Sequence, residues 1–353
     1  MQPNDDNGRL PPEKRPLRVL VIAGSDRRQY NCPGVDSKAR WLALRLADRL
    51  PEDWEIDFED LGNVFGRARI QSCNACVSTA MPLCVWPCNC YEKANKDEPD
   101  LMWDLDLYAR LDLADAWAFV APVNWYAPTS NMKLFFDRLV CMSGGNPRED
   151  LIDHKDPEMA MALESRPEWP ELSRNHLEGR TAAFFSYSDA GADEIGGDGR
   201  PKILRHKPWF DPDKEPFADM RDAYAPLVWQ CRYSGVEAPD ELWAHAPTGV
   251  GLPYSRNQSE HAIAETDFVR AFDDWGDRLM RHIAHKGPVK PGQWRAFDRA
   301  APGHKLADAK LKWREWRMRL GIPPAGSSPR AQQQLGLNKD AVLDPSRPRG
   351  GLD

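Results

Sequence analysis

Short apolar runs alternate with amphipathic stretches along most of the chain. Strands are predicted at residues 17–23, 54–61, 116–121, 181–186 and 236–243. The third and fourth runs, AWAFVA and TAAFFS, are apolar throughout, which is typical of strands covered by helices on both faces. A period of 3.6 residues predicts helices at residues 37–50, 130–142, 217–233 with a break at Pro226, and 259–285. This alternation predicts an α/β fold built on a parallel sheet.

The loops after the strands hold the candidate ligand-binding groups, because open parallel sheets bind ligands beyond the carboxyl ends of their strands. The loop at 24–38 (GSDRRQYNCPGVDSK) offers hydroxyl, amide and guanidinium groups beside a helix N-terminus. Such a loop favours a phosphate, with an ordinary capped turn as the alternative. The loop at 122–130 (PVNWYAPTS) offers a planar ligand an aromatic wall, and the loop at 186–197 has small residues that allow close approach. Neither G-x-G-x-x-G nor a P-loop follows the first strand.

Composition and charge divide the chain into three parts. The 353 residues, 41% of them hydrophobic, suffice for a substantial core. Residues 286–353 carry 14 Lys and Arg against 6 Asp and Glu, whereas residues 1–285 carry 33 against 48. We predict a flexible leader at 1–16, a folded domain at 17–287, and a basic extension at 288–353 that is part helical and part extended. The acidic body is a closer partner for this extension than nucleic acid is, so nucleic acid is not expected as a ligand.

The first twenty residues contain no apolar segment of the kind that forms a secretory signal. No run of eighteen apolar residues occurs anywhere in the sequence, so no membrane-spanning helix is expected. We therefore expect a cytoplasmic protein.

Five of the eight cysteines fall between Ser72 and Tyr91: Cys73, Cys76, Cys84, Cys88 and Cys90. In a reducing compartment such a group indicates metal ligands or redox-active thiols rather than structural disulfides. An iron-sulfur cluster, a zinc ion, and a thiol-rich loop without metal are the alternatives. The other three cysteines are predicted to be small buried side chains.

Two sequence stretches together resemble a known family. Residues 19–27 read VLVIAGSDR, and residues 116–126 (AWAFVAPVNWY) lead into KLFFDRL at 133–139. Both stretches are similar to the flavodoxin-like NAD(P)H-dependent FMN reductases, with a strand ending in G-S-x-R and a later strand ending in P-V-x-W followed by K-x-F-x-D-R. The resemblance spans residues 17–287 and implies a five-stranded flavodoxin-like parallel sheet, order 2-1-3-4-5, with helices on both faces. The longer segment after Arg27 is a departure from the family pattern.

The resemblance also implies FMN as the cofactor and NAD(P)H as the co-substrate, with the chemistry on FMN rather than on a catalytic side chain. The phosphate would be held by Ser25, Arg27, Asn31 and Ser37. The ring would be lined by Pro122, Val123, Asn124, Trp125 and Tyr126, with Ser186, Tyr187, Ser188 and Gly191 at its other edge. Asp137 and Arg138 are predicted to pair on the exposed face of their helix.

The cysteine insertion at 72–91 partly resembles the iron-sulfur flavoprotein subset of this family, whose compact motif binds a four-iron cluster. The spacing here is C-x2-C-x7-C-x3-C-x-C, so Cys73 and Cys76 match the opening pair. We expect at least four of the five cysteines to ligate one metal centre near the flavin. Electrons would pass from the reduced flavin through this centre to an acceptor. A flavodoxin-like electron carrier or interaction module with structural zinc is the alternative, and a disulfide-cycling reductase is a third. A homodimer or homotetramer is expected, because flavin sites in this family commonly lie near subunit contacts.

Overall fold

The computed structural model describes residues 15–27, 37–62, 69–84, 86, 88, 90–91, 100–105, 107–143, 156–172, 177–189, 220–250, 252, 256–257 and 259–289. Five parallel strands form one sheet in the order β2-β1-β3-β4-β5, which confirms the predicted topology. The strands are β1 (Arg18–Ala23), β2 (Glu55–Asp60), β3 (Ala116–Pro122), β4 (Thr181–Asp189) and β5 (Trp243–Thr248).

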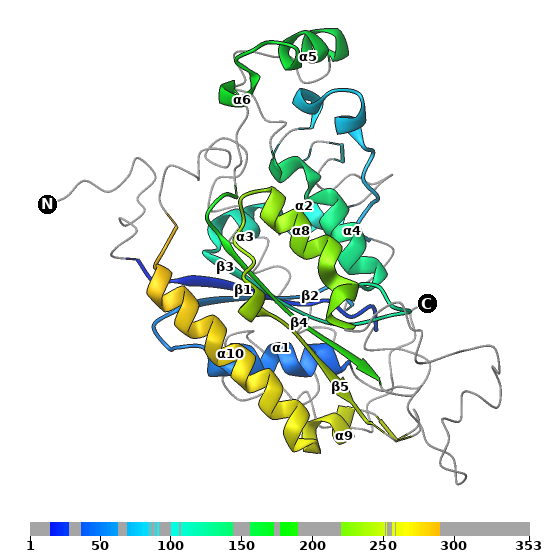
Figure 1. The fold of residues 1–353 in the computed structure, drawn as a ribbon, viewed down its shortest axis with the longest axis vertical. Coiled ribbons are helices and arrows are strands. Elements are labelled where there is room, and N and C mark those ends of the chain that lie inside the picture. The colour runs from blue at the N-terminus through cyan, green and yellow to red at the C-terminus, as the bar shows by residue number, and fades with distance from the viewer. Residues whose placement is uncertain are drawn as a thin grey trace, which may run out of the picture.

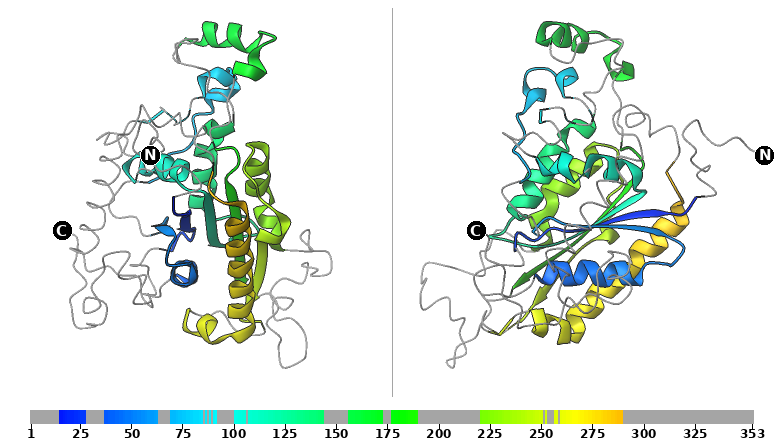
Figure 2. Two further views of the ribbon diagram at one scale, coloured as in Figure 1. Left: turned by 90° about the vertical axis from the view of Figure 1, so that its left-hand side faces the viewer. Right: turned by 180° about the vertical axis from the view of Figure 1, so that it is seen from behind.

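Helices cover both faces of the sheet (Figure 1). One face carries α1 (Lys38–Arg49) and α10 (Thr266–Lys286), with α9 (Ser259–Ala264) at its edge. The other face carries α2 (Leu101–Asp104), α3 (Leu107–Leu113), α4 (Ser130–Arg138) and α8 (Ala225–Tyr233). Short helices α5 (Pro157–Glu164) and α6 (Trp169–Leu172) project beyond the sheet in all three views (Figures 1 and 2). None of the described helices is both long and apolar enough to cross a lipid bilayer.

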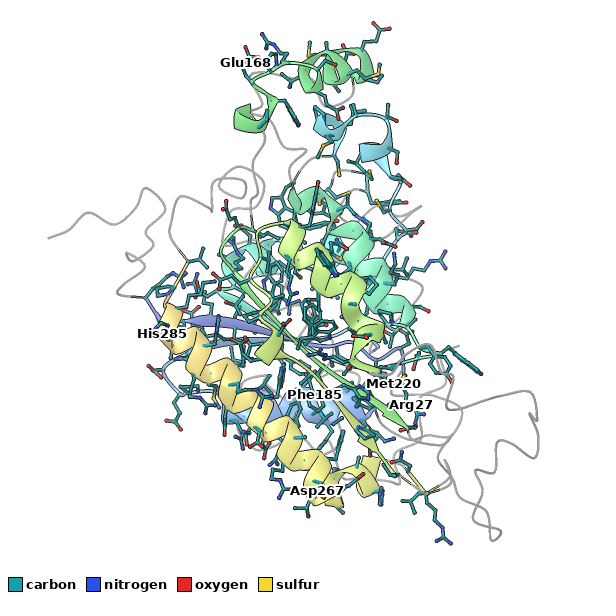
Figure 3. The ribbon with its side chains drawn as sticks, in the orientation of Figure 1. Arg27, Glu168, Phe185, Met220, Asp267 and His285 are labelled. Atoms are coloured by element: carbon teal, nitrogen blue, oxygen red, sulfur yellow. The ribbon has the colours of Figure 1, made fainter. Side chains whose placement is uncertain are left out.

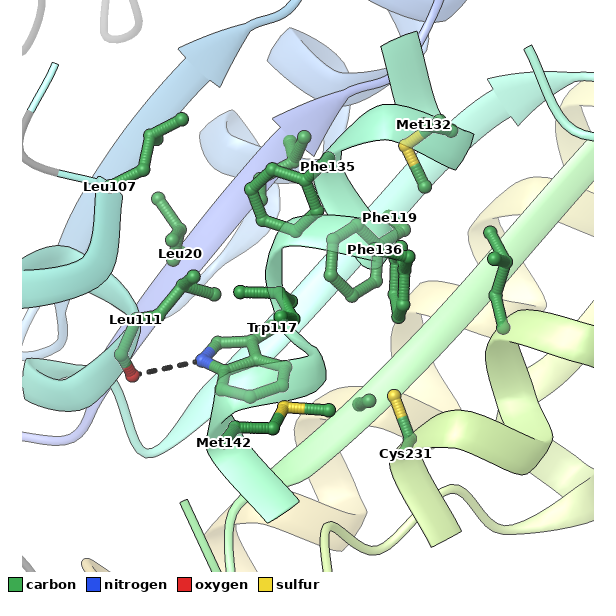
Figure 4. Close-up of a cluster of buried hydrophobic side chains, with 14 of the residues drawn as sticks. Leu20, Leu107, Leu111, Trp117, Phe119, Met132, Phe135, Phe136, Met142 and Cys231 are labelled. Atoms are coloured by element: carbon green, nitrogen blue, oxygen red, sulfur yellow. Dashed lines mark hydrogen bonds between the residues drawn. The ribbon is translucent and has the colours of Figure 1, made fainter. Parts of the chain in front are cut away.

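Side chains alternate between two apolar layers, one on each face of the sheet. Phe119 and Phe184, from neighbouring strands, stack at 5.0 Å beneath α4, and Trp117 donates its indole N–H to the Leu111 carbonyl at 3.1 Å (Figure 4). On the opposite face Phe185 packs against Phe272 of α10 at 4.9 Å. Burial on both faces explains why the central strands read as continuous apolar runs.

The last strand differs from its prediction at 236–243. Glu237 makes only one isolated bridge to Thr181, and a 3-10 turn at Asp240–Leu242 intervenes before β5 begins at Trp243. Pro239 opens that turn and cannot donate a ladder hydrogen bond, so pairing with β4 starts later.

Three helix boundaries also differ from their predictions. Pro226 lies in the first turn of α8, where its missing N–H has no intrahelical partner to lose, so it starts the helix rather than interrupting it. The helix predicted at 130–142 ends at Arg138 and continues as a 3-10 turn at Val140–Ser143. The helix predicted at 259–285 divides at Glu265 into α9 and α10.

The described ends of the chain meet at one buried carboxylate. Asp115 accepts two bonds from the Arg15 guanidinium, at 2.7 and 2.5 Å, and one from the Val289 backbone N–H at 2.8 Å. Both contacts cross the predicted domain boundaries at 16/17 and 287/288. Those boundaries stay a prediction.

Candidate functional site

The carboxyl ends of β1, β3 and β4 bring the predicted site loops side by side. Gly24, just past β1, donates its N–H to the Val120 carbonyl at 2.8 Å, and Val123, just past β3, donates to the Tyr187 carbonyl at 2.7 Å. These bonds extend the strand pairing into the loops. We call the loops after β1, β3 and β4, with the N-termini of α1 and α4, the strand-end site. Figure 3 shows Arg27 at this end of the sheet and Glu168, between α5 and α6, at the far end of the molecule.

At the end of β1, a buried hydroxyl lies beside an exposed cation. The Ser25 Oγ is buried and accepts the Arg27 backbone N–H at 3.1 Å, while the Arg27 side chain is exposed. Arg40, 1% exposed, donates from Nη2 to the Arg27 carbonyl at 3.2 Å and pairs through Nε with buried Asp60. The Arg40–Asp60 pair therefore fixes the backbone of the loop at Arg27, and no sequence pattern indicates this pair.

The N-terminus of α1 supplies the second part of this polar group. Ser37 caps the helix by accepting the Arg40 N–H, as its predicted position requires. The Tyr187 hydroxyl interacts with Ser37 and the Ala39 N–H in the first turn. Burial raises the pKa of Tyr187, although Ala39 and the Arg27 charge act in the opposite direction, so the phenol keeps its proton. Hydroxyls, a cation and a helix N-terminus together fit a phosphate group.

The loop after β3 is a strained two-residue turn. Asn124 and Ala127 exchange backbone hydrogen bonds of 2.9 and 3.1 Å, and Trp125 and Tyr126 between them have φ of 50° and 62°. Positive φ at both central positions defines a type I′ turn, which normally takes Asn or Gly. Trp125 is 90% exposed, so core packing does not account for its place there. Strain of this kind gathers at functional sites, and an exposed indole on a rigid turn fits contact with a planar ligand.

The N-terminus of α4 is tied to β1 by side chains that the sequence did not indicate. Buried Thr129 donates its hydroxyl to the Gly24 carbonyl at 2.5 Å and accepts the Met132 N–H at 3.3 Å. The Asp26 carboxylate accepts the N–H groups of Ser130 and Asn131 at 2.9 and 3.0 Å. Burial raises the pKa of Asp26 despite these bonds.

The end of β4 forms a hydroxyl–imidazole chain with β5. His245 lies between two predicted site residues: its Nδ1 is 3.0 Å from the Ser186 Oγ and its Nε2 is 3.1 Å from the Ser188 Oγ. The sequence missed His245 because the last strand was predicted to end at 243. Two further predicted site residues, Asn31 and Gly191, lie outside the described residues.

The five cysteines of the insertion, here called the thiol cluster, lie close together. Cys76 and Cys90 have their Sγ atoms 3.3 Å apart, and none of the described cysteines forms a disulfide. Burial, followed by the charges of three neighbouring thiols, raises the pKa of Cys84 to about 12. Ala75, with φ of 53°, donates its N–H to the Cys73 Sγ at 3.3 Å. An N–H···S bond within a C-x-x-C turn stabilises a thiolate.

The thiol cluster lies near the carboxyl end of α4, where the Arg138 guanidinium is 4.7 Å from the ring centroid of Tyr91, the residue after Cys90. Cys88 lies near the Arg138 guanidinium. The buried Cys141 thiol, three residues after Arg138 in the sequence, donates to the Arg138 carbonyl at 3.3 Å. Thr129, at the opposite end of α4, contacts the strand ends. Nine helical residues span about 13 Å, so α4 separates the thiol cluster from the strand-end site.

The predicted pairing of Asp137 with Arg138 on the exposed face of α4 is wrong. Asp137 pairs with Lys133 on the surface, whereas the Arg138 side chain is fully buried and pairs with Asp100 at 2.8 Å. The two buried cysteines Cys141 and Cys231 are as predicted, and Cys32 lies outside the described residues.

The thiol cluster is not arranged around a single ion. Within the described ranges, no three His, Cys, Asp or Glu side chains are placed to hold one metal ion. A tetrahedral zinc ion with bonds of about 2.3 Å would hold its sulfurs about 3.8 Å apart, and no such set is preformed. A four-iron cluster takes four cysteine thiolates spread over several metal atoms. A zinc ion and a four-iron cluster can both take four cysteine thiolates, so the number of thiols does not separate the two.

Comparison with known proteins adds a family match. A family model described as NADPH-dependent FMN reductase matches residues 17–201, more than half of the chain. No curated protein matches the sequence. Similar solved structures include an FMN-dependent NADH-azoreductase from Bacillus anthracis in complex with FMN, with 12% identity, a TM-score of 0.35, and coverage of 75% of this chain and 99% of that one. An NAD(P)H:quinone oxidoreductase from Methanothermobacter marburgensis has 14% identity, a TM-score of 0.38, and coverage of 75% and 98%. At these scores the two structures carry no argument about function.

Proposed function

The chain belongs to the NADPH-dependent FMN reductase family and is an NAD(P)H-dependent flavin oxidoreductase, and from this premise we propose that its strand-end site binds FMN. When bound, FMN supplies hydride transfer between the nicotinamide and an acceptor. The observation that carries the proposal is the gathering of Ser25, Arg27 and the N-terminus of α1 beside the strained turn at Trp125.

The side chains divide into two groups by the part of FMN that they would hold. Ser25, Arg27 and Ser37 donate hydrogen bonds or positive charge to the phosphate, and Asn31 is proposed to join them. The turn from Pro122 to Tyr126 lines the ring on one side, and Ser186–Ser188 with Gly191 line it on the other. The Tyr224 hydroxyl donates to the Pro122 carbonyl at 2.8 Å, which holds the base of the turn in place.

The test is FMN affinity measured by flavin fluorescence. Arg27→Ala removes a charge-assisted contact worth about 1.5–3 kcal/mol, so we expect affinity to fall by about tenfold or more. Arg270→Ala is the matched control, because Arg270 is an exposed arginine of α10 that pairs with Asp267. Equal affinities for wild type and Arg27→Ala would rule out the assigned phosphate site.

We also propose that the thiol cluster binds an iron-sulfur cluster, which supplies one-electron transfer when present. Three features support this: the proximity of five thiols, the N–H···S bond at Cys73, and the buried cation of Arg138 beside Cys88. The alternative is an electron carrier or interaction module with zinc at the same cysteines.

Metal analysis of anaerobically purified protein separates the two proposals. We expect iron and sulfide together with flavin, and a visible absorbance that dithionite bleaches. Cys73→Ser and Cys76→Ser should each abolish the centre. Cys231→Ser is the control and should leave it intact, because Cys231 is a buried cysteine of α8 outside the thiol cluster. Zinc without flavin would favour the carrier, and full metal content in both loop variants would leave the segment as a structural loop.

Three further expectations complete the proposal. A homodimer or homotetramer is supported by Trp229 and Tyr233, which are both exposed on one face of α8. A monomeric mass of the full-length chain in light scattering would contradict it.

We propose a cytoplasmic location because close unpaired thiols persist in a reducing compartment. The nicotinamide cofactor and an electron acceptor are the expected partners.

A further inference from the structure

His245 of β5 joins two serines of β4 through both nitrogens of its ring. Its Nδ1 lies 3.0 Å from the Ser186 Oγ, and its Nε2 lies 3.1 Å from the Ser188 Oγ. The parallel pairing places Ser186 opposite His245, and Ser188 lies two residues further along β4, on the same face of the sheet. The chain of hydrogen bonds therefore runs from a fully buried hydroxyl, through a half-buried imidazole, to a half-buried hydroxyl at the end of the strand.

The hydrogen bonds of Ser186 indicate which nitrogen of the neutral ring holds the proton. The Ser186 hydroxyl donates to the Ala244 carbonyl at 3.3 Å, so it accepts from the imidazole Nδ1–H. The neutral ring then has no proton on Nε2, and Nε2 accepts the Ser188 O–H. In this state Ser188 offers a ligand only the lone pairs of its oxygen.

Protonation of the ring reverses the last of these hydrogen bonds. A proton from solvent adds to Nε2, which then donates to the Ser188 Oγ. The Ser188 O–H is released from the ring and can turn toward a ligand. The same hydroxyl therefore acts as an acceptor when His245 is neutral and as a donor when it is charged.

Ser188 borders the loop that carries the strained turn. Tyr187, the residue before it, accepts the Val123 N–H at 2.7 Å, which joins the end of β4 to the loop after β3. Ser188 is half-buried, so a ligand at the strand ends can approach its hydroxyl. A flavin ring presents carbonyl oxygens along one edge, and these oxygens accept hydrogen bonds.

We propose that His245 is a positioning residue, which in its protonated form turns the Ser188 hydroxyl into a hydrogen-bond donor to a carbonyl oxygen of bound FMN. This inference rests on the proposed flavin site. Protonation and FMN binding are then linked, so each strengthens the other by the same factor. FMN should therefore bind more tightly when His245 is charged.

Other ionisable groups surround β5, and the test has to separate them from His245. Apart from α10, which packs on the other face of the strand, the described elements in contact with β5 contribute Arg221, Asp222 and Tyr224 of the 3-10 turn Met220–Tyr224, Tyr187 and Asp189 of β4, and Asp240 and Glu241 of the 3-10 turn before β5. Wild type and a His245 variant share all of these groups. Their comparison at each pH therefore isolates the imidazole.

The experiment measures FMN affinity by flavin fluorescence between about pH 5.5 and 8, where an imidazole ordinarily changes charge. The affinity of the full-length wild type, divided by that of His245→Gln, should rise about tenfold from the upper to the lower pH. The FMN phosphate also changes charge near about pH 6, but it does so for both proteins and cancels in the ratio. His285→Gln is the matched control, because His285 is an exposed histidine of α10.

Two further measurements test the route through Ser188. Ser188→Ala should remove the pH dependence of the ratio, and His245→Gln should have no further effect in that background. Among the signals of the eight histidines in NMR spectra, the His245 signal is the one missing from His245→Gln. FMN should raise its titration midpoint by about one pH unit, which corresponds to the tenfold change in affinity. His245→Asn replaces His245→Gln where the glutamine variant does not fold.

A ratio that is constant with pH, or that falls toward low pH, overturns the inference. A pH dependence that survives Ser188→Ala also overturns it, because the imidazole would then act without the hydroxyl. In each of these cases FMN still binds and the proposed flavin site stands. A wild-type chain that binds no FMN at any pH overturns the flavin site and this inference together.

Discussion

The strand-end site and the thiol cluster lie at opposite ends of α4 and are held in place by different means. At the strand ends, backbone hydrogen bonds of the sheet continue into the loops through Gly24 and Val123. Around the thiol cluster, two 3-10 turns at Cys76–Ser78 and Met81–Leu83 are the regular structure of the described segment, and side chains do the positioning. Arg138 and Trp103 bind it from one side, and α5 packs against it from the other.

The difference shows which parts of each region tolerate substitution. A loop that extends a sheet is placed by main-chain atoms, which any residue supplies. A loop held by side chains depends on each of those side chains. Substitution of a supporting side chain at the thiol cluster should therefore disturb that loop without unfolding the sheet. At the strand ends, only substitution of the few side chains that fix the loop backbone should lower stability.

The largest effect is expected where a side chain does fix the backbone at the strand ends. Asp60→Ala removes the partner of buried Arg40 and should lower the free energy of unfolding by about 3–5 kcal/mol, measured by urea denaturation. Glu55→Ala breaks the exposed pair with Arg18 and should cost no more than about 1 kcal/mol. Similar losses in the two variants would show that Arg40 does not hold the loop.

Thr129→Val tests how far one side chain stabilises the N-terminus of α4 at the strand ends. It removes both the helix cap and the bond to the buried Gly24 carbonyl, for a loss of about 1–3 kcal/mol in thermal or urea unfolding. Thr129→Ser keeps both bonds and should recover most of the loss. A serine variant as unstable as the valine variant would point to the methyl group instead.

Trp103→Phe tests the side-chain control of the thiol cluster. Trp103 donates its indole N–H to the Cys88 carbonyl at 2.9 Å, so phenylalanine should cost about 0.5–1.5 kcal/mol. Metal content measured after dialysis should fall, while FMN affinity stays at the wild-type value. Loss of FMN affinity would mean that the two ends of α4 are not independent.

Trp125→Gly should stabilise the protein slightly, by up to about 1 kcal/mol, because glycine adopts φ of 50° without strain and little packing is lost. FMN affinity should fall in the same variant. Unchanged affinity would remove Trp125 from the flavin contacts and leave only a strained turn.

The smallest expected effect is a pH dependence at Asp26. Burial raises its pKa in the folded state, so the native protein retains this proton to higher pH than the unfolded chain, whose pKa is about 3.9. The free energy of unfolding should therefore fall as pH rises from about 3.9 through the folded-state pKa, and stay lower above it. Asp26→Asn should flatten this part of the profile, and an unaltered profile would contradict the assignment.

The sequence predicts the sheet because the spacing of apolar residues reflects which positions are buried. The positions of the site loops then follow, because ligands bind beyond the carboxyl ends of parallel strands. It misses contacts that depend on register or on buried charge. His245 pairs with Ser186 only when β5 starts at Trp243, seven residues after the start predicted for this strand. Arg138 reads as a surface residue because its partner Asp100 is distant in sequence and charged side chains are rarely buried. No local pattern distinguishes such an arginine from its exposed neighbour Lys133.

The position of β1 between β2 and β3 has a consequence for how this chain can diverge. Both neighbours pair with β1 directly, and the described cysteines of the thiol cluster, between β2 and α2 in the sequence, take no part in that pairing. Lengthening such a connection costs little, since each doubling of a flexible loop adds only about 0.6 kcal/mol. The thiol cluster can therefore be lengthened, shortened or exchanged during evolution or in engineering while the sheet, and α3 that packs on it, stay unchanged.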